Sequence, residues 1–220
     1  MTWLQDAVAL AARLALVGLL GGLVWRGRLR ECRAFGAYVV AVLAGNTLVS
    51  LWPSRFLTPE FWVAKQGIYD ILKTAIALEL AWHAFRAFPG ALRTARLVFL
   101  VLLGSSCVAL AFPARPAYAV LWEWQPAVAT AGLWMLTATA LMVVWYQVPL
   151  GGWQRTIMIG LAVYQLVFII LLGLLKSRGW GMGTFVATVE ATAYLALVAG
   201  WAWVAWRRDA PAAAELRRAA

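Results

Sequence analysis

The chain has 220 residues, of which 64% are hydrophobic and only 13% are charged. Soluble domains contain roughly 45–50% apolar and about 25% charged residues, so this composition excludes an ordinary soluble domain. The formal net charge of +10 could indicate nucleic-acid binding. The connections between the apolar stretches are too short to form a soluble surface for it, so we expect no nucleic-acid partner.

Seven apolar stretches are long enough to cross a bilayer, which takes about 20 residues. We place them near residues 3–25, 34–52, 61–86, 94–112, 126–147, 154–175 and 182–206. These stretches take up most of the chain, and no soluble domain fits into the connections that remain. The sequence therefore predicts an all-α, polytopic membrane protein with a seven-transmembrane-helix bundle over residues 1–206 and a basic tail over residues 207–220.

The basic residues predict the orientation of this bundle. If the chain alternates across the bilayer, twelve of them fall on one side: Arg26, Arg28, Arg30, Arg33, Arg86, Arg93, Arg96, Arg155, Arg207, Arg208, Arg217 and Arg218. The other side receives five: Arg55, Lys65, Arg115, Lys176 and Arg178. Because cytoplasmic loops carry the excess of Lys and Arg, we expect the N-terminus outside and the C-terminus in the cytoplasm. The expected location is the inner (cytoplasmic) membrane of the cell, as a multi-pass protein whose first partner is the lipid bilayer.

Tryptophans mark the ends of several predicted spans, as expected for the membrane interface. Trp25 and Trp52 end the first two spans, and Trp206 ends the last. The aromatic segment 116–125 (PAYAVLWEWQ) precedes the fifth span, and we expect it to lie on the outer surface as a short interfacial turn or helix.

The third span carries the most informative residues of the chain. Gln66, Tyr69, Asp70 and Lys73 follow the spacing of residues that share one helix face. A charge in the hydrocarbon core costs several kcal/mol, so this face must point into the bundle or a wet cavity.

Other spans bring complementary groups to the same predicted depth. Arg13 lies in the first span, and Glu190 and Tyr194 share a face of the seventh. Arg13, Lys73, Asp70 and Glu190 together are formally neutral, which suggests that they pair. Two interpretations remain open: a structural clamp made of buried ion pairs, or an outward-facing cavity that binds a small polar ligand or relays a proton.

A second polar group lies on the cytoplasmic half of the third span. Glu79, His83 and Arg86 are related by four and three residues, on roughly the opposite side of the helix from Asp70. We expect Glu79 to hold the imidazole of His83 as a cation. This group is either a packing clamp between helices or a pH-sensing histidine site.

The residue inventory narrows the possible chemistry. With His83 as the only histidine, a bis-histidine haem and a zinc site with several histidines are excluded. The seventh span contains no lysine for a retinal Schiff base. No nucleophile with a base and no phosphate loop is present. We therefore expect no metal, no cofactor and no enzymatic activity.

The run Glu79–Arg96 (ELAWHAFRAFPGALRTAR) combines an acid, an aromatic and basic helix end, and the turn F-P-G-x-L-R. With the spans before it, this run resembles a group of small uncharacterised bacterial seven-helix integral membrane proteins. The similarity covers mainly the second to fourth spans. It implies the seven-helix fold and no particular activity.

Three functions fit these observations. The first is a non-enzymatic binding or sensory protein with its site in the outer half of the bundle. The second is an accessory or structural subunit of a larger membrane complex, with a membrane-protein partner or a homo-oligomer. The third is a small transporter or proton-coupled permease, for which the chain lacks a convincing internal repeat.

Overall fold

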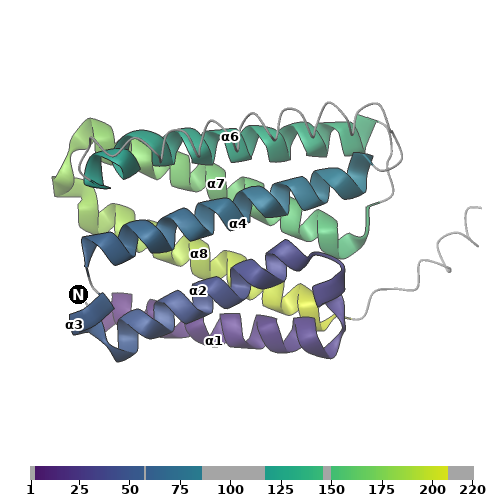
Figure 1. Ribbon diagram of the computed structural model, residues 1–220, viewed down its shortest axis with the longest axis horizontal. Helices are drawn as coiled ribbons and strands as arrows, with labels where there is room; N and C mark the ends of the chain where they lie inside the picture. The colour runs from purple at the N-terminus through teal and green to yellow at the C-terminus, as the bar shows by residue number, and fades with distance from the viewer. Residues whose placement is uncertain (1–2, 57, 86–116, 146–149, 208–220) are drawn as a thin grey trace, which may run out of the picture.

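The computed structural model describes residues 3–56, 58–85, 117–145 and 150–207, and within them every element is helical (Figure 1). The six long helices are α1 (Trp3–Trp25), α2 (Arg33–Leu51), α4 (Pro59–Phe85), α6 (Ala117–Trp145), α7 (Gly152–Arg178) and α8 (Gly183–Trp206). The short elements are α3 (Pro53–Phe56) and the 3₁₀ turns η1 (Arg28–Arg30) and η2 (Trp180–Met182).

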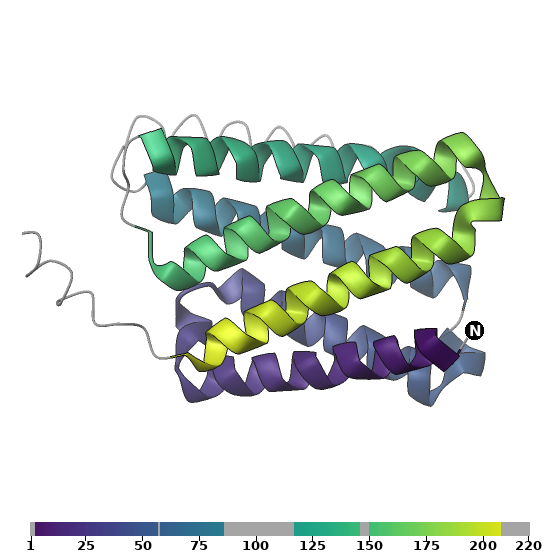
Figure 2. The ribbon, with the colours of Figure 1, turned by 180° about the vertical axis from the view of Figure 1, so that it is seen from behind.

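The six long helices pack side by side as a ring. Helix α1 contacts α2, α2 contacts α4, and α4 contacts α6; α6 then contacts α7, and α7 contacts α8. Helix α8 returns to lie along α1, so the first and last described helices close the ring (Figures 1 and 2). This closure brings polar residues from the two ends of the chain to the same interior.

Glycine and proline mark where the helices begin and end. Gly27 and Gly179 follow α1 and α7 with φ angles of 67° and 76°, in a region that side chains with a Cβ rarely adopt. Pro53 and Pro59 are the first residues of α3 and α4, where a missing backbone N–H costs nothing.

One half of the bundle is filled by apolar side chains. Phe35 of α2 packs edge-on against the indoles of Trp153 and Trp201, with ring centroids 5.5 and 4.9 Å away. All three side chains are fully buried, and such edge-to-face pairs add to the gain from burial alone. This packed half contains the carboxyl ends of α1 and α8.

The outer surface of the bundle is strongly apolar. Large exposed side chains include Leu14, Val24, Trp145, Ile170 and Trp203. In the part of the chain that the structure describes, four helical segments are long and apolar enough to cross a membrane: Asp6–Trp25, Arg33–Leu51, Gly152–Arg178 and Gly183–Trp206. An apolar exterior on an all-helical bundle indicates a membrane protein, because a soluble protein rarely exposes such an extended apolar surface.

Two basic residues of the first connection cap the end of α8. The buried guanidinium of Arg28 donates hydrogen bonds to the carbonyls of Val204 and Arg207, at 2.7 and 2.9 Å. It also lies 5.5 Å from the ring centroid of Trp153. Arg26 donates to another carbonyl of this terminus at 3.0 Å. A cation here satisfies free carbonyls and is attracted to the negative end of the helix dipole. The connection between α1 and α2 is therefore also bound to the end of α8.

The all-helical prediction is confirmed, and the helices that correspond to five of the predicted spans begin and end within three residues of the predicted bounds. Segment 116–125 is helical from Ala117 onwards, but it is not the separate short element that the sequence predicts. Helix α6 begins at Ala117 and continues through Pro126, so the segment extends the helix that follows it. A proline inside a helix loses one backbone hydrogen bond, and membrane helices tolerate this loss more often than soluble ones. The predicted span 94–112 and the tail from residue 208 lie outside the described residues.

Candidate functional site

A cavity of about 710 Å³ lies between α1, α2, α4, α7 and α8. It occupies the end of the bundle where α1, α4 and α8 begin and where α2 and α7 end, which is the end marked N in Figure 1. Its volume is within the range of small-molecule sites, roughly 300–1,000 Å³. The polar residues that line it are Arg13, Tyr38, Asn46, Ser50, Lys65, Gln66, Tyr69, Lys73, Tyr164, Glu190 and Tyr194.

The cavity extends from the end of the bundle towards its middle. Along α8 its lining begins at Gly183 and ends at Tyr194, a rise of about 16 Å at about 1.5 Å per residue. The deepest lining residues of α2 and α4 are Tyr38 and Lys73. Below them begins the apolar core, so the floor of the cavity is formed by phenol rings and one ammonium group.

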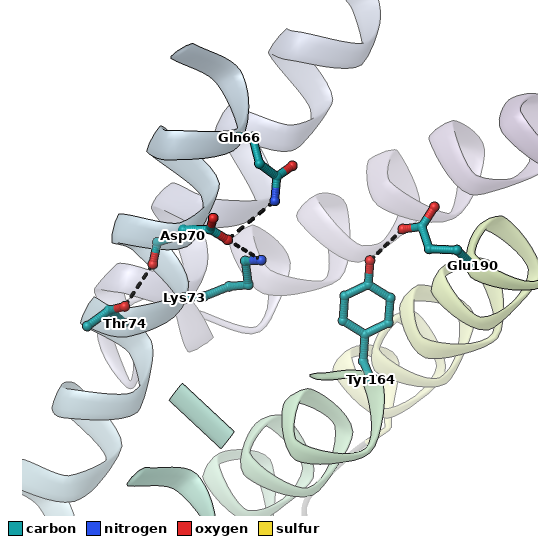
Figure 3. A network of polar contacts seen from close by, with 6 residues as sticks. All are labelled: Gln66, Asp70, Lys73, Thr74, Tyr164 and Glu190. Carbon is teal, nitrogen blue, oxygen red and sulfur yellow. Dashed lines mark hydrogen bonds and ion pairs between the residues drawn. The ribbon is translucent and has the colours of Figure 1, made fainter. Parts of the chain in front are cut away.

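Asp70 and Lys73 form a closed ion pair in the wall of the cavity. Lys73 Nζ lies 2.6 Å from Asp70 Oδ1, and the two side chains are only 8% and 13% exposed, respectively. The amide of Gln66 donates to the same carboxylate oxygen at 3.3 Å (Figure 3). Lys73 Nζ also lies 5.7 Å from the ring centroid of Phe168 on α7. Lys73 lines the cavity and Asp70 supports it from behind.

Glu190 faces this pair from the other side of the cavity. The hydroxyl of Tyr164 on α7 donates a hydrogen bond of 2.7 Å to Glu190 Oε1 (Figure 3). The ring of Tyr164 also packs edge-on against Tyr194, at a centroid distance of 5.7 Å. Within the described part of the chain, the carboxylate accepts from a phenol and has no cation within 4.0 Å.

Tyr69 joins α4 to α2 beside the cavity. Its hydroxyl donates to the carbonyls of Ala41 and Val42, at 3.5 and 3.4 Å. Gly45 makes this approach possible, because a Cβ there would overlap the Tyr69 hydroxyl. The ammonium of Lys65 lies 5.9 Å from the Tyr69 ring centroid.

The structure brings most of the predicted site residues to one cavity. Arg13, Gln66, Tyr69, Lys73, Glu190 and Tyr194 all line it. The expected pairing of the four charged residues is found for Asp70 and Lys73 alone, which form the one ion pair within 4.0 Å among the described residues of the cluster. Glu190 accepts its hydrogen bond from a tyrosine hydroxyl instead. Tyr164 reaches Glu190 because α7 and α8 are neighbours in the ring.

Lys65, Tyr38 and Phe168 are among the cavity residues that sequence reasoning did not assign to the site. Lys65 precedes Tyr69 by four residues and Lys73 by eight, so its place on the same face of α4 was available from helical spacing. Tyr38 is likewise two turns before Asn46 on α2. The position of Phe168 depends on how α7 packs against α4. The spacing of residues within one helix gives no information about this packing.

The second predicted group has a different arrangement from the one expected. The carboxylate of Glu79 does not hold His83; it accepts hydrogen bonds from the backbone N–H groups of Arg33 and Ala34, at 2.9 and 2.8 Å. It therefore caps the first turn of α2, where free N–H groups and the helix dipole favour an anion. His83 Nδ1 instead lies 2.7 Å from the backbone carbonyl of Glu79. Arg86 lies outside the described residues.

Cys32 belongs to the same cap. Its thiol donates to Glu79 Oε2 at 3.2 Å, and it lies just before the first residue of α2. Burial, and then the negative charge of Glu79, raise the pKa of the Cys32 thiol well above its usual range. A thiolate is therefore disfavoured at this position, and Glu79 serves as a packing clamp between α4 and α2.

No protein-family model matches the chain, and searches of curated proteins and of solved structures likewise gave no match. Within residues 3–56, 58–85, 117–145 and 150–207, no three His, Cys, Asp or Glu side chains lie close enough to hold a metal ion.

Proposed function

We propose that this chain is a non-enzymatic, binding or sensory protein of the bacterial inner membrane. In this proposal the bundle spans the membrane seven times, and a small polar ligand binds in the cavity. The observation that carries the proposal is the cavity itself, lined by charged and phenolic side chains from five helices.

A cluster that served packing alone would be expected to close on itself. Charged side chains in an apolar bundle cost several kcal/mol unless they are paired or solvated. Here Arg13, Lys65 and Glu190 border open space, and Lys73 reaches the same space while paired with Asp70. The ion pair then acts as a clamp in the wall of a binding site, so the two interpretations left open by the sequence are combined.

The proposed topology gives the cavity a direction. With the N-terminus outside, the end of the bundle where α1 begins faces the outside, and the cavity opens there. The arginine-rich connections, including Arg28, then lie on the cytoplasmic side. A ligand that touches five helices would change their relative positions, which is how such a protein would report binding to a partner.

A transporter is the less favoured alternative because of the packed half of the bundle. Fully buried side chains such as Leu19, Phe35, Leu80 and Trp201 fill the space below the cavity. A route across the membrane would have to separate these helices. If neither a candidate solute nor a proton gradient produces flux in proteoliposomes, the transporter hypothesis is excluded.

An accessory subunit is the other alternative, and it predicts co-purification with a stoichiometric partner after gentle detergent extraction. A clean monomer or homo-oligomer would contradict it.

Thermal unfolding of the purified full chain, screened against small polar metabolites, tests the proposed function. A ligand present at 100 times its Kd stabilises the folded state by about 2.7 kcal/mol, which a melting curve detects easily. The matched variants are Ala191→Phe, which fills the cavity wall, and Ala196→Phe, on the exposed face of the same helix.

We expect at least one compound to stabilise the parent protein and Ala196→Phe but not Ala191→Phe. A screen without a stabiliser, or a stabiliser that acts equally on Ala191→Phe, would overturn the assignment of a binding site to this cavity.

A further inference from the structure

The charges around the cavity do not balance. Its lining carries three cations, Arg13, Lys65 and Lys73, and one anion, Glu190. Asp70 lies behind the wall and neutralises Lys73 through their ion pair. Counted over the described residues, one positive charge therefore remains in excess. In a surrounding of low dielectric constant, such an excess favours the entry of one negative charge.

Hydrogen-bond donors are also left over. Among the described residues, neither Arg13 nor Lys65 has a carboxylate within 4.0 Å; Lys65 meets the face of the Tyr69 ring instead. The hydroxyl of Tyr194 is buried in the cavity wall and makes no hydrogen bond within the same part of the chain. The Tyr38 hydroxyl is a close polar neighbour, and even a mutual hydrogen bond between these two phenols would leave one O–H free to donate. A buried polar group without a partner is costly, and a ligand with acceptor oxygens would satisfy it.

Much of the remaining wall is apolar. Phe168 and Leu172 of α7 face the cavity, together with Val8 of α1 and Val186 of α8. These side chains cannot contact a fully polar ion such as phosphate favourably. They complement an alkyl or aryl body, whose burial is worth about 25 cal/mol for each Å² removed from water.

We infer that the cavity takes a small organic monoanion, a carboxylate with an apolar body. This inference rests on the proposed function and names the class of its ligand. The carboxylate lies between Arg13 and Lys65 and accepts from Tyr194, while the apolar body lies against Phe168 and the aliphatic wall. A zwitterion would leave the positive excess in place, and Glu190 already accepts one hydrogen bond from Tyr164.

Four six-carbon probes that share an alkyl chain separate the possible charges: hexanoate, hexylamine, hexanol and the zwitterion norleucine. Their binding to the purified full chain in nonionic detergent is measured by isothermal titration calorimetry at neutral pH. We expect hexanoate to bind at least about tenfold more tightly than hexanol, because one additional charge interaction at an effective dielectric constant near 20 is worth more than this factor and desolvation of the carboxylate offsets part of it. In nanodiscs, hexadecanoate in place of hexanoate distinguishes a fatty acid of the bilayer from a soluble acid.

Substitutions of the charged residues in the cavity wall test the same inference, because removing a cation and removing the anion should change hexanoate affinity in opposite directions. Arg13→Gln and Lys65→Gln each weaken hexanoate binding by about tenfold and leave hexanol binding unchanged. Glu190→Gln removes the competing negative charge and tightens hexanoate binding. Arg13→Lys keeps the charge and retains most of the binding, which controls for loss of folding in the glutamine variant.

The results separate this inference from the proposed function. If hexylamine, norleucine or hexanol binds the parent protein best, the cavity binds ligands but its preference for an anion is refuted. If hexanoate binds and Glu190→Gln weakens it, the charge argument is refuted as well. If no probe binds and the metabolite screen finds a stabiliser of another chemical class, the anion inference is refuted and the proposed function stands. If no probe binds and the screen finds no stabiliser, both the inference and the proposed function are refuted.

Discussion

Asp70→Asn tests whether the ion pair of α4 stabilises the bundle. The substitution keeps the size of the side chain, removes its charge and leaves the Lys73 ammonium without a counter-ion in the wall. Breaking a buried ion pair by removing one partner costs about 3–5 kcal/mol. Lys73 keeps its contact with the Phe168 ring, which is worth about 0.5–2 kcal/mol, and its ammonium borders the cavity. We therefore expect the free energy of unfolding to fall by about 2 kcal/mol.

A double-mutant cycle isolates the pair itself. Lys73→Met leaves the Asp70 carboxylate with one donor, the Gln66 amide, and we expect a loss of about 2 kcal/mol. The double variant Asp70→Asn/Lys73→Met leaves no unpaired charge, so its loss should not exceed that of either single variant. The resulting coupling energy is about 2 kcal/mol, within the range found for residues in direct contact.

The free energies of unfolding are measured by titrating the purified protein in mixed micelles with a denaturing detergent. Asp6→Asn on the exposed start of α1 is the matched control, and we expect it to change stability by no more than about 0.5 kcal/mol. A coupling energy below about 0.5 kcal/mol, as in exposed ion pairs, would refute the conclusion that the low exposure of this pair makes it strong.

Three further substitutions test contacts outside the cavity by the same unfolding titration. Glu79→Gln should lower stability by about 1–2 kcal/mol, because the amide keeps one acceptor oxygen for two backbone donors. The same substitution should speed maleimide labelling of Cys32 at pH 8, measured in a variant whose other cysteine is serine. Losing the Glu79 charge lowers the pKa of the thiol and so increases the fraction of thiolate. An unchanged labelling rate would contradict the contact between Glu79 and Cys32. Arg28→Ala should cost about 3 kcal/mol by uncapping α8, and a loss as small as that of a surface substitution would show that water replaces the guanidinium. Gly160→Ala should lower the free energy of unfolding by about 1–3 kcal/mol, because its Cβ would lie 2.7 Å from an indole nitrogen of α8. The control Gly173→Ala has open space around it and should be near neutral. Equal effects of the two substitutions would mean that α7 and α8 separate freely.

The positions of the helices followed closely from the sequence. Apolar runs of the length of a bilayer give α1, α2, α7 and α8 directly, because backbone groups without water must form their hydrogen bonds within a helix. The start of α6 did not follow, since Pro126 and the aromatic residues before it also fit an interfacial segment. Local pattern cannot distinguish a helix that ends at the interface from one that continues through it.

The candidate site followed from the sequence only in part. Helical spacing identified Gln66, Tyr69, Asp70 and Lys73 as one polar face, and neighbours on one helix depend on fixed geometry alone. The partner of Glu79 was assigned wrongly. A residue four positions away on the same helix was the nearest candidate in the sequence, whereas the free N–H groups of another helix made the stronger contact.

The sequence by itself determined that this chain is helical, apolar on its exterior and charged at a few interior positions, because these properties depend on composition and on periods within single helices. The Asp70–Lys73 pair lies three residues apart on one helix and was within reach of the sequence. The tertiary structure alone decided the contacts between helices: Glu190 accepts from Tyr164, and Arg13 and Lys65 lie at the wall of a cavity. The physical reason is that electrostatic and hydrogen-bond energies depend on distances between helices, and those distances are fixed by how side chains such as Phe35, Trp153 and Trp201 pack in the core.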